Sequence, residues 1–99
     1  MRSYDNPAQA IQVAPGEAFA VRLAGNPTTG YTWRASVDSS YLELVGREFE
    51  PRGEGVGAGG HEVFRFRAQA AGETEIIFEY RRPWGGAARD VARFRVVIG

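Results

Sequence analysis

Residues 18–36 read AFAVRLAGNPTTGYTWRAS, and this stretch predicts two β-strands joined by a short polar connection. In the first segment, residues 18–23, the apolar side chains of Phe19, Val21 and Leu23 occupy every second position. Alternation with a period of two is typical of a strand that is buried on one face. The second segment, residues 31–36, repeats the pattern and places Trp33 on the apolar face. The sequence is therefore expected to form neighbouring strands around this connection.

The rest of the chain carries the same signal. Alternating or apolar segments separated by turn residues occur at 9–13, 41–49, 62–68, 74–80 and 90–98. No segment shows a sustained apolar period of 3.6, which an amphipathic helix would require. About seven or eight short antiparallel strands in 99 residues predict an all-β, immunoglobulin-like β-sandwich that forms one domain over residues 1–99, with Trp33 as its central core aromatic. Residues 1–8 are polar and are expected to form a loose tail.

Composition narrows the possible partners. Twelve basic residues balance twelve acidic ones, so neither nucleic acid nor an anionic membrane is a predicted partner, since both attract a basic excess. The chain lacks cysteine, which excludes disulfides and thiolate chemistry. It has no apolar run of the ~18 residues that a membrane span needs and no visible leader. We expect a monomer that is cytoplasmic, or periplasmic or secreted if a leader has been removed.

Catalytic and cofactor chemistry find little support. His61 is the only histidine, and the edge of a glycine-rich segment is a poor place to hold a catalytic base. The glycines at positions 55, 57 and 60 match the dinucleotide-binding spacing as letters. They precede a predicted strand, however, whereas that motif must open a helix. The prediction is a protein without enzymatic activity, catalytic residues, metal or cofactor.

Three connections carry unusual residues. The threonine loop (residues 26–31) contains two hydroxyls between a proline and a glycine, the glycine loop (residues 50–60) contains five glycines, and the tryptophan loop (residues 81–89) contains a tryptophan that looks exposed. In a sandwich, alternate connections lie at the same end. We therefore expect the three loops to lie side by side on a rigid scaffold, as the recognition loops of binding modules do.

The residues of these loops also resemble a known family. In order and separation they are similar to the three signature loops of the chagasin-like inhibitors of papain-family cysteine proteases: Asn26, Pro27, Thr28, Thr29, Gly30 and Tyr31, then Gly57, Ala58, Gly59 and Gly60, then Arg82, Pro83 and Trp84. The resemblance covers nearly the whole chain. It implies an immunoglobulin-like sandwich that blocks the active-site cleft of a papain-family protease by reversible, non-covalent, tight binding.

The resemblance also implies a role for each loop. Thr28 and Thr29 would enter the catalytic centre of the protease, and the backbone of residues 57–60 would pair with the protease main chain on the non-primed side. Trp84 would pack on an aromatic surface on the primed side. Arg82 would orient the tryptophan loop or reach an acidic group of the enzyme.

Alternatives remain open at this level. The same sandwich is compatible with an immunoglobulin-like adhesion or binding module whose loops recognise another protein or a glycan. Locally, the hydroxyls of Thr28 and Thr29 can serve their own turn. The glycines can act as a plain linker, and Trp84 can fold back onto the sheet as a minor apolar cluster.

Overall fold

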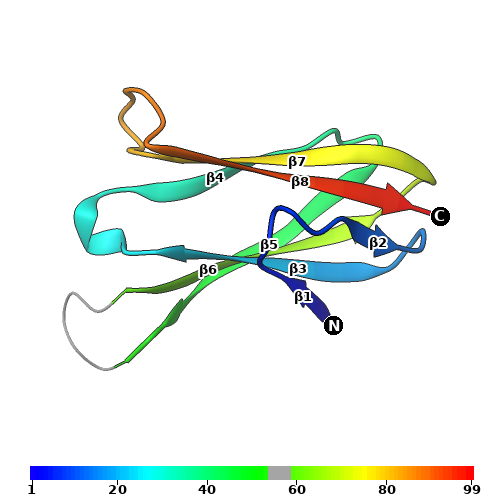
Figure 1. The fold of residues 1–99 in the computed structure, drawn as a ribbon, viewed down its shortest axis with the longest axis horizontal. Helices are drawn as coiled ribbons and strands as arrows, with labels where there is room; N and C mark the ends of the chain where they lie inside the picture. The colour runs from blue at the N-terminus through cyan, green and yellow to red at the C-terminus, as the bar shows by residue number, and fades with distance from the viewer. Residues whose placement is uncertain (54–58) are drawn as a thin grey trace.

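Eight strands form two four-stranded sheets that pack face to face in the computed structural model, which describes residues 1–53 and 59–99 (Figure 1). The first sheet has the order β1 (Arg2–Tyr4), β3 (Ala18–Gly25), β6 (Gly60–Ala68) and β5 (Leu42–Pro51). The second has the order β2 (Ile11–Val13), β8 (Asp90–Ile98), β7 (Gly72–Arg81) and β4 (Thr32–Ser36). One turn of 3₁₀-helix, η1 (Pro27–Thr29), joins β3 to β4. The predicted all-β sandwich is confirmed.

Strand pairing fixes which ends of the strands lie together. In the first sheet Gly25 at the end of β3 and Pro51 at the end of β5 both pair with Gly60 at the start of β6. In the second sheet Thr32 at the start of β4 pairs with Arg81 at the end of β7. The β3–β4, β5–β6 and β7–β8 connections therefore begin and end at one end of the sandwich, the left end in Figure 1. In the described part of the chain no helix is long and apolar enough to cross a membrane.

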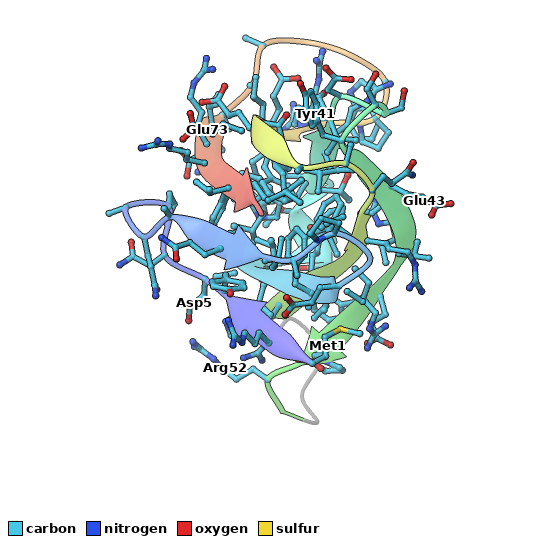
Figure 2. All side chains as sticks on the ribbon, turned by 90° about the vertical axis from the view of Figure 1, so that its right-hand side faces the viewer. Met1, Asp5, Tyr41, Glu43, Arg52 and Glu73 are labelled. Atoms are coloured by element: carbon cyan, nitrogen blue, oxygen red, sulfur yellow. The ribbon has the colours of Figure 1, made fainter. Side chains whose placement is uncertain are left out.

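The core consists of the apolar residues at alternate positions. Phe64 of β6 contacts Phe78 of β7 with ring centroids 5.1 Å apart, and Phe78 contacts Phe94 of β8 at 5.6 Å. These rings join the two sheets, and each buried side chain of this size stabilises the fold by about 1.5–3 kcal/mol. Figure 2, viewed from the end opposite the three connections, shows the side chains filling the space between the sheets, with the charged Glu43 and Glu73 at the periphery.

The N-terminal expectation was wrong. Residues 2–4 do not form a loose tail but pair in parallel with β3, with Arg2 opposite Phe19 and Tyr4 opposite Val21. The Tyr4 ring also packs edge-on against Phe19, with centroids 6.2 Å apart. The edge of β3 offers unpaired backbone groups that a short segment can satisfy, and the Tyr4 ring adds a contact with the core. β2 pairs in parallel with β8 as well, so the two sheets are mixed and not wholly antiparallel as predicted.

β5 also departs from simple alternation. The pairing with β6 shifts register between Leu44 and Gly46, and this β-bulge places two residues opposite one. Leu44 and Val45 are consequently both exposed, whereas Leu42 before the bulge is fully buried. The strands also extend further into the predicted glycine loop than expected, since β5 ends at Pro51 and β6 begins at Gly60.

Candidate functional site

The threonine loop is a closed and internally bonded turn. The backbone N–H of Thr29 donates to the carbonyl of Asn26 at 3.1 Å, which forms η1. The Thr28 hydroxyl donates to Asn26 Oδ1 at 2.6 Å, and the Thr29 hydroxyl donates to the Asn26 carbonyl at 2.7 Å. Both threonines are nevertheless exposed. The hydroxyls therefore stabilise their own turn, while both side chains stay exposed.

This bonding decides what the tip can offer to another molecule. Each hydroxyl has one proton, and in both threonines that proton is already directed to Asn26. The exposed surface of Thr28 and Thr29 therefore consists of methyl groups and oxygen lone pairs. A side chain that is already ordered also loses little conformational entropy when it docks.

Gly30 brings the threonine loop against the tryptophan loop. Its φ of +82° lies in the left-handed region, which favours glycine. A Cβ added at this position would lie 3.2 Å from the Trp84 ring. Gly30 therefore allows both the turn and the close approach of the indole.

The glycine loop is held at its base by close backbone packing. The Arg52 N–H donates to the Gly59 carbonyl at 2.9 Å. A Cβ on Gly59 would lie 3.1 Å from the Gly25 carbonyl oxygen, and one on Gly60 would lie 2.2 Å from that of Glu50. Gly60 is buried and paired on both sides, so it supports the hairpin from within the sheet. The predicted site residues Gly57 and Ala58 lie outside the described residues.

The tryptophan loop projects from the same end. The Gly85 N–H donates to the Arg82 carbonyl at 3.2 Å, and the Arg81 guanidinium donates to the Gly86 carbonyl at 3.0 Å. Trp84 is 74% exposed, so the alternative that it folds back onto the sheet is wrong. An exposed indole next to Pro83 on a bonded turn is a large apolar surface that the described part of this chain leaves mostly uncovered.

A stack of rings connects this exposed loop to the core. The buried Trp33 packs on Tyr80 with centroids 4.8 Å apart, and Tyr80 stacks on Tyr31 at 5.5 Å. The Arg82 guanidinium lies 4.8 Å from the centre of the Tyr31 ring and 5.8 Å from that of Trp84. These are cation–π distances. The stack ties the threonine loop and the tryptophan loop to one another and to the sandwich.

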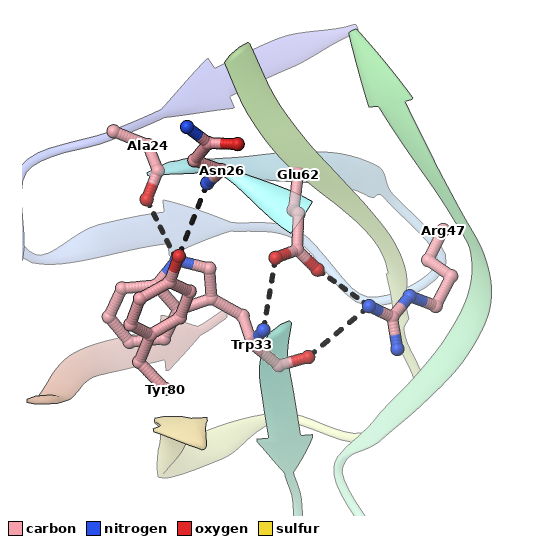
Figure 3. A network of polar contacts seen from close by, with 6 residues as sticks. All are labelled: Ala24, Asn26, Trp33, Arg47, Glu62 and Tyr80. Carbon is pink, nitrogen blue, oxygen red and sulfur yellow. Dashed lines mark hydrogen bonds and ion pairs between the residues drawn. The ribbon is translucent and has the colours of Figure 1, made fainter. Parts of the chain in front are cut away.

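A buried carboxylate fastens the start of β4. Glu62 is 6% exposed, and its Oε2 accepts the Trp33 N–H at 3.0 Å while its Oε1 accepts from Arg47 at 2.6 Å. Arg47 also donates to the Trp33 carbonyl at 3.3 Å (Figure 3). β4 is the last strand of its sheet, and an edge strand leaves backbone groups unpaired. Glu62 and Arg47 of the other sheet satisfy those of Trp33.

Two further hydrogen bonds hold the Trp33 side chain and the threonine loop in place. The indole N–H of Trp33 donates to the Ala24 carbonyl at 2.9 Å. The Tyr80 hydroxyl accepts the backbone N–H of Asn26 at 3.2 Å (Figure 3). The threonine loop is thus connected to the core at its first residue, directly after β3.

Glu62 and Arg47 were missed by reasoning from the sequence. A signal for Glu62 existed, because it shares the parity of Phe64 and Phe66 and so must point inward on the same strand. For Arg47 the sequence holds no such signal, since the β-bulge before it shifts the alternation of β5. The described residues contain no group of three or more acidic or histidine side chains that could hold a metal ion.

The geometry is that of a β-sandwich presenting a threonine turn and an exposed tryptophan at one end. Residues 12–98 match the family model described as Chagasin family peptidase inhibitor I42. Chagasin from Trypanosoma cruzi is 35% identical over 94 residues, which cover 89% of this chain and 86% of chagasin. Amoebiasin-1 from Entamoeba histolytica is 34% identical over 87 residues, covering 87% of this chain and 85% of that protein.

This chain therefore belongs to the chagasin family, a family of peptidase inhibitors and not of enzymes. The crystal structure of the cysteine protease inhibitor EhICP2 from Entamoeba histolytica has the same fold, with a TM-score of 0.79 at 20% sequence identity. The alignment covers 99% of this chain and 96% of EhICP2. The immunoglobulin-like sandwich and the family that the sequence resembles are both confirmed.

Proposed function

We propose that this protein inhibits papain-like cysteine proteases by reversible, non-covalent, tight binding, and that its three loops fill the active-site cleft. The observation that carries the proposal is the contact between the threonine loop and the 74%-exposed Trp84 at one end of a rigid sandwich. Family membership supplies the class of activity, and the resemblance of the loop motifs supplies the class of protease. The protein acts as a monomer.

The arrangement suits a blocking wedge. Thr28 and Thr29 present methyl groups and lone pairs on a turn that is already closed by hydrogen bonds, so docking orders little that was free. Trp84 supplies a large rigid ring of the kind that often contributes ~2 kcal/mol or more to an interface. Gly60 is buried and already paired on both sides, so it supports the glycine loop from its base. The residues proposed to pair with the main chain of the protease are therefore Gly57, Ala58 and Gly59.

A titration tests the proposal. Increasing amounts of the protein are added to papain and to cathepsin L, and residual activity on a peptide substrate is followed together with the mass of the added protein. We expect stoichiometric inhibition that is reversed on dilution and leaves the chain uncut. Full activity of both proteases at micromolar concentrations of the protein would contradict the proposal and favour an adhesion or binding module.

A further inference from the structure

A basic pocket lies beside the tryptophan loop, at the edge formed by β4. Its volume is about 210 Å³, and its lining includes four arginines: Arg34, Arg47, Arg81 and Arg82. Pro83 also lines the pocket, and Trp84 is the next residue in the sequence. Arg34 comes from β4, outside the three loops of the proposed site.

Two of the four positive charges are already neutralised. The Glu62 carboxylate accepts from Arg47 at 2.6 Å, and the Glu79 carboxylate lies 3.5 Å from Arg81. Arg34 stands opposite Glu79 in the β4–β7 register, but within the described residues it forms no ion pair. The pocket thus retains an uncompensated positive charge on Arg34.

The second uncompensated charge belongs to Arg82. Its guanidinium rests over the rings of Tyr31 and Trp84, at 4.8 Å and 5.8 Å from their centres, and no carboxylate of the described residues pairs with it. Ring contacts hold a guanidinium in place without removing its charge. Two like charges lining one small pocket favour an anion from outside.

We propose that this pocket receives a carboxylate side chain of the target protease, from an aspartate or glutamate on the rim of its cleft. The inference rests on the proposed function and adds a contact outside the three loops. Guanidinium groups bind carboxylates through paired hydrogen bonds, and the pocket is large enough for such a group. Because Pro83 and Arg82 line it, a protease that covers Trp84 also reaches the pocket. The chain as a whole carries no net charge, which argues against a polyanionic surface as the occupant.

Charge reversal at Arg34 tests this inference. The variants are Arg34→Glu and Arg34→Gln, and the control is Arg67→Glu. Arg67 is exposed and lies at the end of β6 that is far from the three connections, so the control makes the same charge change away from the pocket. Association rates and inhibition constants are measured for papain and cathepsin L at low and high ionic strength. Thermal unfolding of each variant shows that the fold is kept.

The expected result is slower association and weaker inhibition by the Arg34 variants, with a difference from wild type that shrinks at high salt. Arg34→Glu should slow association and weaken inhibition by about tenfold at low salt for at least one protease, and Arg34→Gln by about threefold. The difference from wild type should shrink at high salt because screening shortens the reach of the charge. Arg67→Glu should behave as wild type.

Other outcomes overturn the inference and are distinguishable from failure of the proposed function. If wild type inhibits but Arg34→Glu equals Arg67→Glu on both proteases, the pocket does not contact the enzyme. If inhibition is unchanged while inorganic phosphate shifts the NMR signals of the Arg34 and Arg82 side chains in the free protein, the pocket is a small-anion site instead. If wild type inhibits neither protease, the proposed function fails, and this inference fails with it.

Discussion

The two tryptophans of this chain have opposite surroundings. Trp33 is 6% exposed, and its indole and backbone N–H groups both donate to oxygens of the opposite sheet. Trp84 is 74% exposed and touches its surroundings through Gly30 and Arg82. They lie 51 positions apart in the sequence. The stacked rings of Trp33, Tyr80 and Tyr31 connect their surroundings. The same residue type thus holds the fold at position 33 and stays available for a partner at position 84.

The largest expected effect comes from removing the buried ring. Trp33→Ala should destabilise the protein by about 3–5 kcal/mol, because it leaves a cavity between the sheets and removes the indole donor to Ala24. Chemical denaturation followed by circular dichroism measures this loss. A variant that unfolds at the wild-type denaturant concentration would show that Trp33 is not the central core aromatic. Trp33→Phe, which keeps an aromatic ring, should lose less.

The next effect tests the buried carboxylate that holds Trp33. Glu62→Ala should cost about 2–3 kcal/mol of stability, since it removes the carboxylate partner of Arg47 and the acceptor of the Trp33 N–H. The matched control is Glu48→Ala, because Glu48 pairs with Arg65 on an exposed face and such pairs contribute at most about 1 kcal/mol. Equal losses in the two variants would mean that the Glu62 network is not a special support.

Removing the Trp84 ring should weaken inhibition and leave stability almost unchanged, whereas removing the Trp33 ring should lower stability. Trp84→Ala is expected to raise the inhibition constant about thirtyfold, the equivalent of ~2 kcal/mol, while the unfolding temperature changes little. The two measurements on one preparation separate binding from folding. If Trp84→Ala lowered stability as much as Trp33→Ala does, Trp84 would instead belong to the core.

The smallest effect concerns the link between the two regions. Tyr80→Phe keeps the ring between Trp33 and Tyr31 but removes the hydroxyl that accepts the Asn26 N–H, at a cost of about 1 kcal/mol. Hydrogen exchange at the Asn26 amide should become faster, and inhibition should weaken slightly. Tyr41→Phe is the control, because the Tyr41 ring packs on the core while its hydroxyl makes no hydrogen bond within the described residues. Unchanged exchange at Asn26 would show that the loop does not depend on this bond.

Much of the architecture could be predicted from local pattern. Alternation identified β3, β4, β6, β7 and β8 within two residues of their bounds, and it placed Phe19, Val21, Leu23 and Trp33 on buried faces. The order and separation of the loop motifs indicated the family. Predictions failed where alternation was broken or weak, at the bulge after Leu44 and at the short strand β1.

The sequence by itself determined the strands other than β1, the inward face of those that keep a regular alternation, and the three loops, because these depend on residues within a few positions of one another. Only the tertiary structure decided how Glu62 and Arg47 close the edge of β4, and how Arg34 and Arg82 come to line one basic pocket. Such contacts join strands of different sheets or distant turns. Their geometry depends on register and bulges, which no single segment encodes.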